Sequence, residues 1–178
     1  MKRYVQKVTL GLLFSSILSV GMLFGASDVS AQDVGASLTQ QIQGSWVLVS
    51  AYNDRDGKKT EVFGPNPRGS MILAPDGRFS MILMNASLPK FASNIRMKGT
   101  AEENKAIVQG SLAYFGSYKV ANEKENKVTL NIEKSTFPNW DGQEQSRSMT
   151  VIGDEMMFIS TNTTVDGGTN YLSWKRIK

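Results

Sequence analysis

Gly44-Ser45-Trp46-Val47-Leu48-Val49-Ser50 opens the folded part of this chain, and Trp174-Lys175-Arg176 closes it. Between these segments lie short stretches of strand-forming residues, separated by turn signals such as Pro75-Asp76-Gly77 and Gly153-Asp154. A tryptophan on the first strand and an arginine on the last fit a sheet that closes on itself, because its first and last strands then meet. The two segments therefore predict a small closed barrel, a fold that commonly encloses a ligand.

Eight predicted strands follow one another along the chain without repeated strand–helix units. They cover residues 46–53, 69–73, 78–84, 111–120, 127–135, 142–152, 155–161 and 169–177. This order predicts an all-β fold, an eight-stranded antiparallel up-and-down barrel, with a two-sheet sandwich as the structural alternative.

One short helix is expected over residues 100–109, because Thr100 and Glu103 have capping-box spacing and Gly110 ends the run. The strand segments at 46–49 and 80–84 are apolar on both faces. We therefore expect the helix to cover the outer face of one of these strands.

The N-terminal residues have the plan of a secretory signal peptide. Lys2, Arg3 and Lys7 precede an apolar run over residues 8–26, and Val29-Ser30-Ala31 forms a small-residue cleavage site. An uncleaved membrane anchor is the alternative. The expected organisation is a signal peptide over residues 1–31, a flexible leader over 32–37 and a barrel domain over 38–178. A cleaved product would be periplasmic or secreted, with no membrane span left.

The composition excludes several classes of chemistry. The chain has no Cys and no His, which excludes thiol catalysis and Ser-His-Asp relays and argues against a zinc site. We expect neither a metal nor a cofactor. The formal net charge of +4 derives partly from the signal peptide, and no basic run remains in the rest of the chain. A nucleic-acid partner is therefore not expected.

Alternation along the strands predicts which side chains face the interior. On the strand over residues 142–152, the apolar Met149 and Val151 share a face with Gln145 and Arg147. Those two polar side chains should therefore point inward with them. A buried arginine needs a partner, and two interpretations stay open. Arg147 pairs internally with a carboxylate or a tyrosine oxygen, or it receives an acidic or carbonyl group of a ligand.

The same alternation turns Tyr114 and Tyr118 inward from the strand over residues 111–120. On the last strand Trp174 and Arg176 share a face. We expect Arg176 to stack on Trp46 and to close one end of the barrel.

Seven short motifs resemble those of the bacterial and fungal lipocalin-like domain, within the wider calycin group, over residues 38–178. They are the segments at 44–50, 64–69, 75–78, 114–118, 137–140, 142–147 and 174–176. The resemblance implies a barrel that encloses a small molecule. It also marks a departure, because relatives often carry histidine where Leu130 and Asn131 stand. This lowers the expectation of acid–base catalysis.

Together these arguments give a candidate site. The proposed ligand-binding residues are Tyr114, Tyr118, Trp140, Gln145, Arg147 and Met149, and the proposed barrel-closure residues are Trp46, Trp174 and Arg176. No catalytic or metal-binding residue is assigned.

The first functional hypothesis is a barrel that binds a small hydrophobic or amphipathic molecule with a polar or acidic end. The alternative is a cofactor-independent cyclase, isomerase or hydratase that uses Tyr114, Tyr118 and Arg147. A third hypothesis is a barrel with a filled core that interacts with another envelope protein through its surface.

The exported protein should begin at Gln32, because Val29-Ser30-Ala31 meets the small-residue requirement of signal peptidase. N-terminal sequencing of the protein from the culture medium or the periplasm measures this directly. A retained Met1, or a product found only in the membrane fraction, would contradict it.

Overall fold

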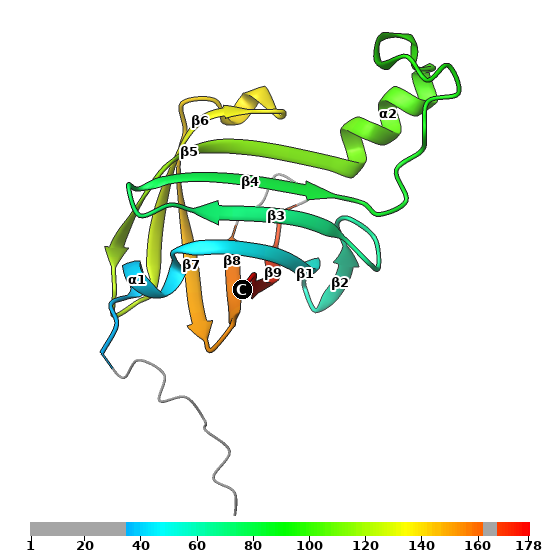
Figure 1. Cartoon of the computed structure of the whole chain (residues 1–178). Coiled ribbons are helices and arrows are strands. Elements are labelled where there is room, and N and C mark those ends of the chain that lie inside the picture. The colour runs from blue at the N-terminus through cyan, green and yellow to red at the C-terminus, as the bar shows by residue number, and fades with distance from the viewer. Residues whose placement is uncertain (1–34, 162–166) are drawn as a thin grey trace, which may run out of the picture. The chain divides into compact units, whose positions relative to one another are not determined.

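The computed structural model describes residues 35–161 and 167–178 (Figure 1). The predicted signal peptide and residues 32–34 of the predicted leader lie outside the described residues. The helices are α1 (Leu38–Ile42) and α2 (Ala101–Gly110), with 3-10 turns η1 (Arg96–Lys98) and η2 (Pro138–Trp140). The strands are β1 (Gly44–Arg55), β2 (Lys58–Glu61), β3 (Arg68–Leu73), β4 (Arg78–Met84), β5 (Ser111–Asn122), β6 (Lys127–Ser135), β7 (Glu144–Ile152), β8 (Glu155–Thr161) and β9 (Thr169–Arg176).

The strands form one antiparallel sheet that closes on itself. From β3 to β9 each strand pairs with the next along the chain, and β1 pairs with both β3 and β9. The described residues thus form an eight-stranded closed barrel, as predicted, and the sandwich alternative is wrong. The sequence analysis missed β2, a short ninth strand that pairs with Tyr52–Arg55 at the end of β1. All four residues of β2 are exposed, so it has no apolar alternation that could reveal it.

Inward alternation agrees with the prediction on the long strands. Val128, Leu130 and Ile132 are fully enclosed on β6, as is Met149 on β7. Tyr114 is also buried. The barrel interior is therefore built from alternate residues of each strand.

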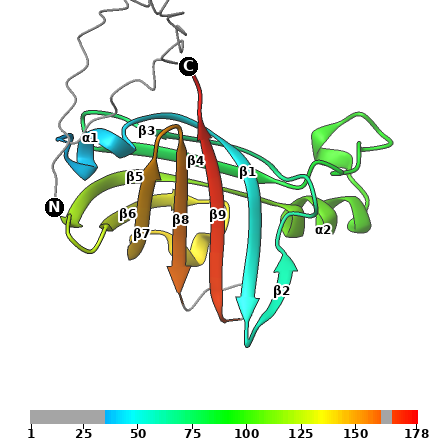
Figure 2. The same ribbon diagram turned by 90° about the horizontal axis from the view of Figure 1, so that it is seen from below.

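One end of the barrel is covered by α1 (Figure 2). The interior at this end is filled with large buried side chains. Ser37 caps α1 with a capping box, and the helix buries Leu38 and Ile42. The indole nitrogen of Trp46 donates a hydrogen bond to the carbonyl oxygen of Ile42 at 2.9 Å. The other large, fully buried side chains of this half are Met71, Leu73, Val128, Met149, Met156 and Trp174. We call this end of the barrel the filled half.

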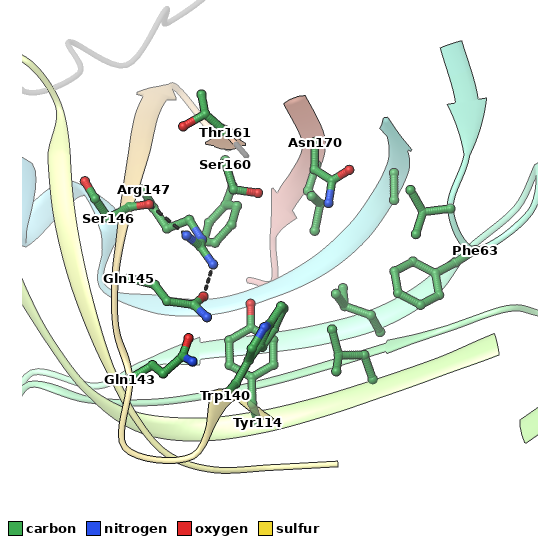
Figure 3. A pocket seen from close by; sticks show the side chains of 16 residues that line it. Phe63, Tyr114, Trp140, Gln143, Gln145, Ser146, Arg147, Ser160, Thr161 and Asn170 are labelled. Carbon is green, nitrogen blue, oxygen red and sulfur yellow. Dashed lines mark hydrogen bonds between the residues drawn. The ribbon is translucent and has the colours of Figure 1, made fainter. Parts of the chain in front are cut away.

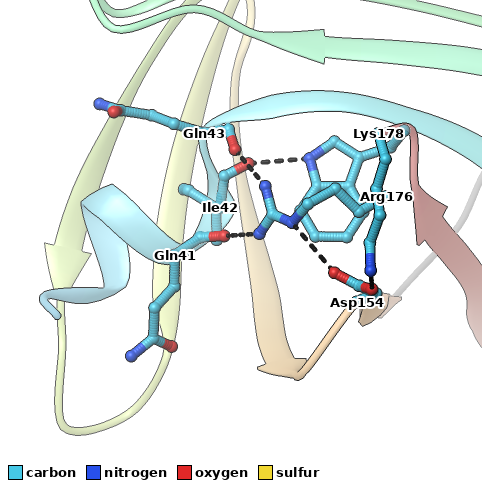
Figure 4. A network of polar contacts seen from close by, with 7 residues as sticks. Gln41, Ile42, Gln43, Asp154, Arg176 and Lys178 are labelled. Carbon is cyan, nitrogen blue, oxygen red and sulfur yellow. Dashed lines mark hydrogen bonds and ion pairs between the residues drawn. The ribbon is translucent and has the colours of Figure 1, made fainter. Parts of the chain in front are cut away.

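Arg176 joins the last strand to the first strand and to α1 (Figure 4). Its guanidinium lies 4.2 Å from the centre of the Trp46 ring. Its two terminal nitrogens donate hydrogen bonds of 2.6 Å to the backbone carbonyls of Gln41 and Gln43. Carbonyls at a helix C-terminus lack partners within the helix, so Arg176 supplies the donors that the end of α1 needs.

The expectation that a helix covers an outer barrel face is wrong. α2 buries no residue and projects beyond the barrel (Figure 1). Val49 on the outer face of β1 is 56% exposed, and Ile82 on β4 is 45% exposed. The reason lies at the base of the helix, where the amide of Asn85 donates to the carbonyl of Gly110 at 2.8 Å. This bond keeps both ends of the segment at the rim, so the helix between them points away from the wall.

Replacing Arg176 should destabilise the fold without removing the cavity. Arg176→Ala should lower the free energy of unfolding by about 1–2 kcal/mol, because the stacking on Trp46 and the donors to α1 are both lost. Denaturant unfolding followed by circular dichroism measures the change. Lys175→Ala is the matched control, because Lys175 is an exposed neighbour on the same strand. A variant that keeps wild-type stability but no longer binds ligand would show that Arg176 belongs to the binding site instead.

Candidate functional site

The half of the barrel opposite α1 is hollow. It contains a cavity of about 380 Å³, within the size range of small-molecule sites. Figure 3 shows the side chains around it. They are Ala51, Val62, Phe63, Leu83, Leu112, Tyr114, Trp140, Gln143, Gln145, Ser146, Arg147, Phe158, Ser160, Thr161, Asn170 and Leu172. We call this end of the barrel the hollow half.

The cavity exists because small side chains face inward at this level of the barrel. Ala51 on β1 and Ser160 on β8 occupy inward positions, whereas the same strands carry Trp46 and Met156 in the filled half. Small inward side chains leave space that the eight-stranded wall cannot close by itself. The difference in side-chain volume between the two halves therefore creates the site.

One wall of the cavity is aromatic. The ring centres of Tyr114 and Trp140 lie 5.3 Å apart at an interplanar angle of 87°, and Phe137 packs edge-on against Trp140 at 5.8 Å. Asp141 holds the η2 turn that carries Trp140, because its carboxylate accepts from the Ser135 amide and from the Lys134 ammonium, each at 2.9 Å. The bond to Lys134 also lowers the pKa of Asp141. The edge-to-face rings form a rigid apolar surface.

The hydroxyl of Tyr114 is turned into the core and stays protonated. It donates to the sulfur of Met81 at 2.9 Å. Burial raises the pKa of Tyr114 to about 12, although the nearby Arg147 opposes part of the rise. Tyr114 is therefore neutral at physiological pH and cannot act there as an ionised base.

Arg147 lies on the other side of the cavity, and no described residue is its charged partner. One terminal nitrogen donates to the Ser146 carbonyl at 2.8 Å, and the other donates to the side-chain oxygen of Gln145. The guanidinium lies 5.8 Å from the centre of the Phe158 ring. Its Nε is buried and has no hydrogen-bond partner among the described residues. Burial lowers the pKa of Arg147, yet a guanidinium remains charged in proteins.

These contacts bear on the two interpretations of Arg147 for the described residues. No carboxylate there forms an ion pair with it. Its protein partners are neutral oxygens, which use two of the five N–H groups of a guanidinium. A half-buried cation that is only partly satisfied favours a ligand with an acceptor or anionic group.

Three polar residues that the sequence analysis did not single out lie on the same side of the barrel. Ser160 on β8 stands opposite Asn170 on β9, and Asn170 stands opposite Asn53 on β1. The side-chain nitrogen of Asn53 donates to the side-chain oxygen of Asn170 at 2.8 Å and to the Gly167 carbonyl at 2.9 Å. Strand parity could have found Asn170, because it shares a face with Leu172 and Trp174.

The structure separates the proposed ligand-binding residues into two groups. Tyr114, Trp140, Gln145 and Arg147 come together around the cavity. Tyr118 and Met149 lie in the filled half, where Tyr118 donates to the Ala74 carbonyl at 2.8 Å and Met149 is completely buried. Alternation gives the face on which a side chain lies but not its level along the barrel axis.

The described residues contain no cluster of three or more acidic, Cys or His side chains that could hold a metal ion. Within the same ranges, no helix has the length and apolarity needed to cross a membrane.

Comparison with known proteins agrees with the fold. The model of the lipocalin-like domain family matches residues 43–177. The chain is 27% identical over 103 residues to the 4'-hydroxy-3'-methoxypropiophenone carrier protein ppsC of Aspergillus oryzae, an alignment that covers 53% of this chain and 93% of that protein. The chain is thus a member of the lipocalin-like domain family.

Proposed function

We propose that this protein is a carrier that holds a small aromatic molecule in the hollow half of its barrel, with an acidic or carbonyl oxygen of the ligand against Arg147. The observation that carries the proposal is a half-buried guanidinium, with a buried and unpaired Nε among the described residues, that faces an aromatic wall across a cavity of about 380 Å³. Apolar walls with a few converging polar groups are typical of small-molecule sites.

The relative from Aspergillus oryzae supports this choice of ligand class. Its name describes a carrier of a small aromatic ketone. An aromatic ring with an oxygen substituent is also what the cavity of this chain suits, since Tyr114 and Trp140 offer ring contacts and Arg147 offers donors. We propose further that the carrier acts in the periplasm or outside the cell, after removal of the signal peptide.

Binding explains the site better than catalysis does. Tyr114 is protonated, and its hydroxyl is directed at a methionine sulfur. Tyr118 lies away from the cavity, with its hydroxyl on a backbone carbonyl. Neither tyrosine is placed to move a proton on a bound molecule. The cavity likewise argues against a barrel with a completely filled core.

Native mass spectrometry of protein purified from its own host should reveal a co-purifying small molecule, and Arg147→Met should lose it. The substitution keeps most of the side-chain volume but removes the charge. It should weaken binding about 10-fold to 100-fold, equivalent to about 1.5–3 kcal/mol. Its melting temperature should be unchanged or raised, because the protein partners of Arg147 are neutral.

Arg68→Met is the matched control, since it removes the same charge from an exposed position at the start of β3. The control should retain the ligand. A large loss of stability in Arg147→Met, with affinity unchanged, would assign Arg147 to the structure and not to the ligand.

Benzoate, a small aromatic anion, should quench the fluorescence of Trp140. The chain has three tryptophans. Trp46 and Trp174 are buried in the filled half, whereas Trp140 lines the cavity. Trp140→Phe should therefore remove the quenching while Trp174→Phe retains it. Equal quenching in both variants would place the bound molecule elsewhere.

A further inference from the structure

The polar side of the cavity forms a row across four neighbouring strands. Asn53, Asn170 and Ser160 are aligned across β1, β9 and β8. The pairing of Ser148 with Ile159 brings Arg147 on β7 to the level of Ser160, one position further along. The inward side chains of this row thus present hydrogen-bonding groups along one wall, and Tyr114 and Trp140 belong to the aromatic wall (Figure 3).

The bond from Asn53 determines which way the amide of Asn170 points. Because the Asn53 nitrogen donates to the Asn170 oxygen at 2.8 Å, that oxygen is already occupied. The amide nitrogen of Asn170 is then the group left for the cavity. It has no hydrogen-bond partner among the described residues, and Asn170 is one of the lining residues. A primary amide nitrogen has two donors and no acceptor.

Gln145 is oriented in the same way. Its side-chain oxygen accepts from Arg147, and its nitrogen has no hydrogen-bond partner within residues 35–161 and 167–178. Both side-chain amides on this wall, those of Gln145 and Asn170, therefore accept hydrogen bonds from the protein through their oxygens. Their nitrogens are left to donate to a ligand in the cavity. With the remaining N–H groups of Arg147, the wall offers donors on β7 and on β9.

The strand spacing sets how far apart these donors lie. Arg147 and Asn170 are two strands apart, about 10 Å between backbones at the usual spacing of about 4.8 Å per strand. Their side chains both project inward, which shortens this separation at the ligand. Two oxygens on the same edge of one aromatic ring can reach both groups, whereas oxygens at opposite ends of the ring cannot both face one wall.

We propose that the ligand carries two acceptor oxygens on the same edge, one bound by Arg147 and the second by the Asn170 amide, which Asn53 holds in its donor orientation. This inference rests on the proposed function. It adds that Asn170 selects ligands that carry a second acceptor oxygen. Asn53 is the positioning residue, because it holds the Asn170 amide in place.

Isothermal titration calorimetry with three substituted benzoates tests the proposal. The carboxylate binds Arg147 in each. We expect 3-acetylbenzoate, with its second acceptor on the same edge, to bind about threefold to tenfold tighter than benzoate, the gain typical of one added hydrogen bond. 4-Acetylbenzoate has the same atoms and charge but should show no such gain. 3-Aminobenzoate, which presents a donor at this place, should bind more weakly than 3-acetylbenzoate.

Asn170→Asp is the sharpest variant, because it keeps the oxygen that accepts from Asn53 and replaces the free donor by an acceptor. For each variant, the affinity for a substituted benzoate is divided by the affinity for benzoate. The negative charge that the substitution adds weakens the binding of every benzoate anion, so its effect cancels from this ratio. The preference for 3-acetylbenzoate should disappear and 3-aminobenzoate should gain. Thr169→Val is the control and should keep the wild-type ratios, because Thr169 is next to Asn170 on β9 but is not among the lining residues.

Asn53→Asp tests the positioning role, since a carboxylate there accepts from the Asn170 amide and turns its oxygen toward the cavity. The ratios should shift as in Asn170→Asp, an effect that a general loss of stability does not produce. If Asn53→Asp does not fold, Asn170→Asp decides alone.

The outcomes separate the two proposals. If none of the benzoates binds, the proposed function is wrong and the inference falls with it. If benzoate binds but 3-acetyl and 4-acetyl isomers are equal, or Asn170→Asp keeps the wild-type ratios, only the second-acceptor inference is overturned.

Discussion

Closure of the sheet between β1 and β9 is the constraint on which the rest of this structure depends. The pairing joins residues that are more than one hundred positions apart, and Arg176 reinforces it by stacking on Trp46 and bonding to the end of α1. An open sheet would expose unpaired edges and an apolar face. Once β1 and β9 are joined, inward side chains share one enclosed volume, and their sizes decide where that volume is filled.

The two ends of the barrel serve different purposes because of this distribution of sizes. Large side chains and α1 occupy the filled half, which supplies the buried apolar area that stabilises the fold. The hollow half buries less apolar area, because Ala51 and Ser160 stand where larger side chains would fill the space. The cavity is therefore held by a scaffold whose stability derives from the opposite end. Substitutions in the hollow half can alter binding with little effect on folding.

The electrostatics of the hollow half follow from the position of Arg147. Its guanidinium is partly removed from water and receives neutral oxygens from Gln145 and Ser146. Such an arrangement leaves electrostatic free energy to be gained from an incoming anion or carbonyl. The aromatic wall and the oriented Asn170 amide add shape and polarity to that attraction.

The sequence by itself determined the fold class, the inward faces of β5, β6, β7 and β9 and the pairing of Trp46 with Arg176, because these depend on residue periodicity and on the meeting of the terminal strands. It also indicated Arg147 and Gln145 as inward polar groups. Tertiary structure alone decided that Tyr118 belongs to the filled half and that Asn53 orients Asn170. The reason is geometric: a period of two residues gives the face of a strand, whereas strand register and barrel tilt set the level at which side chains from distant segments meet.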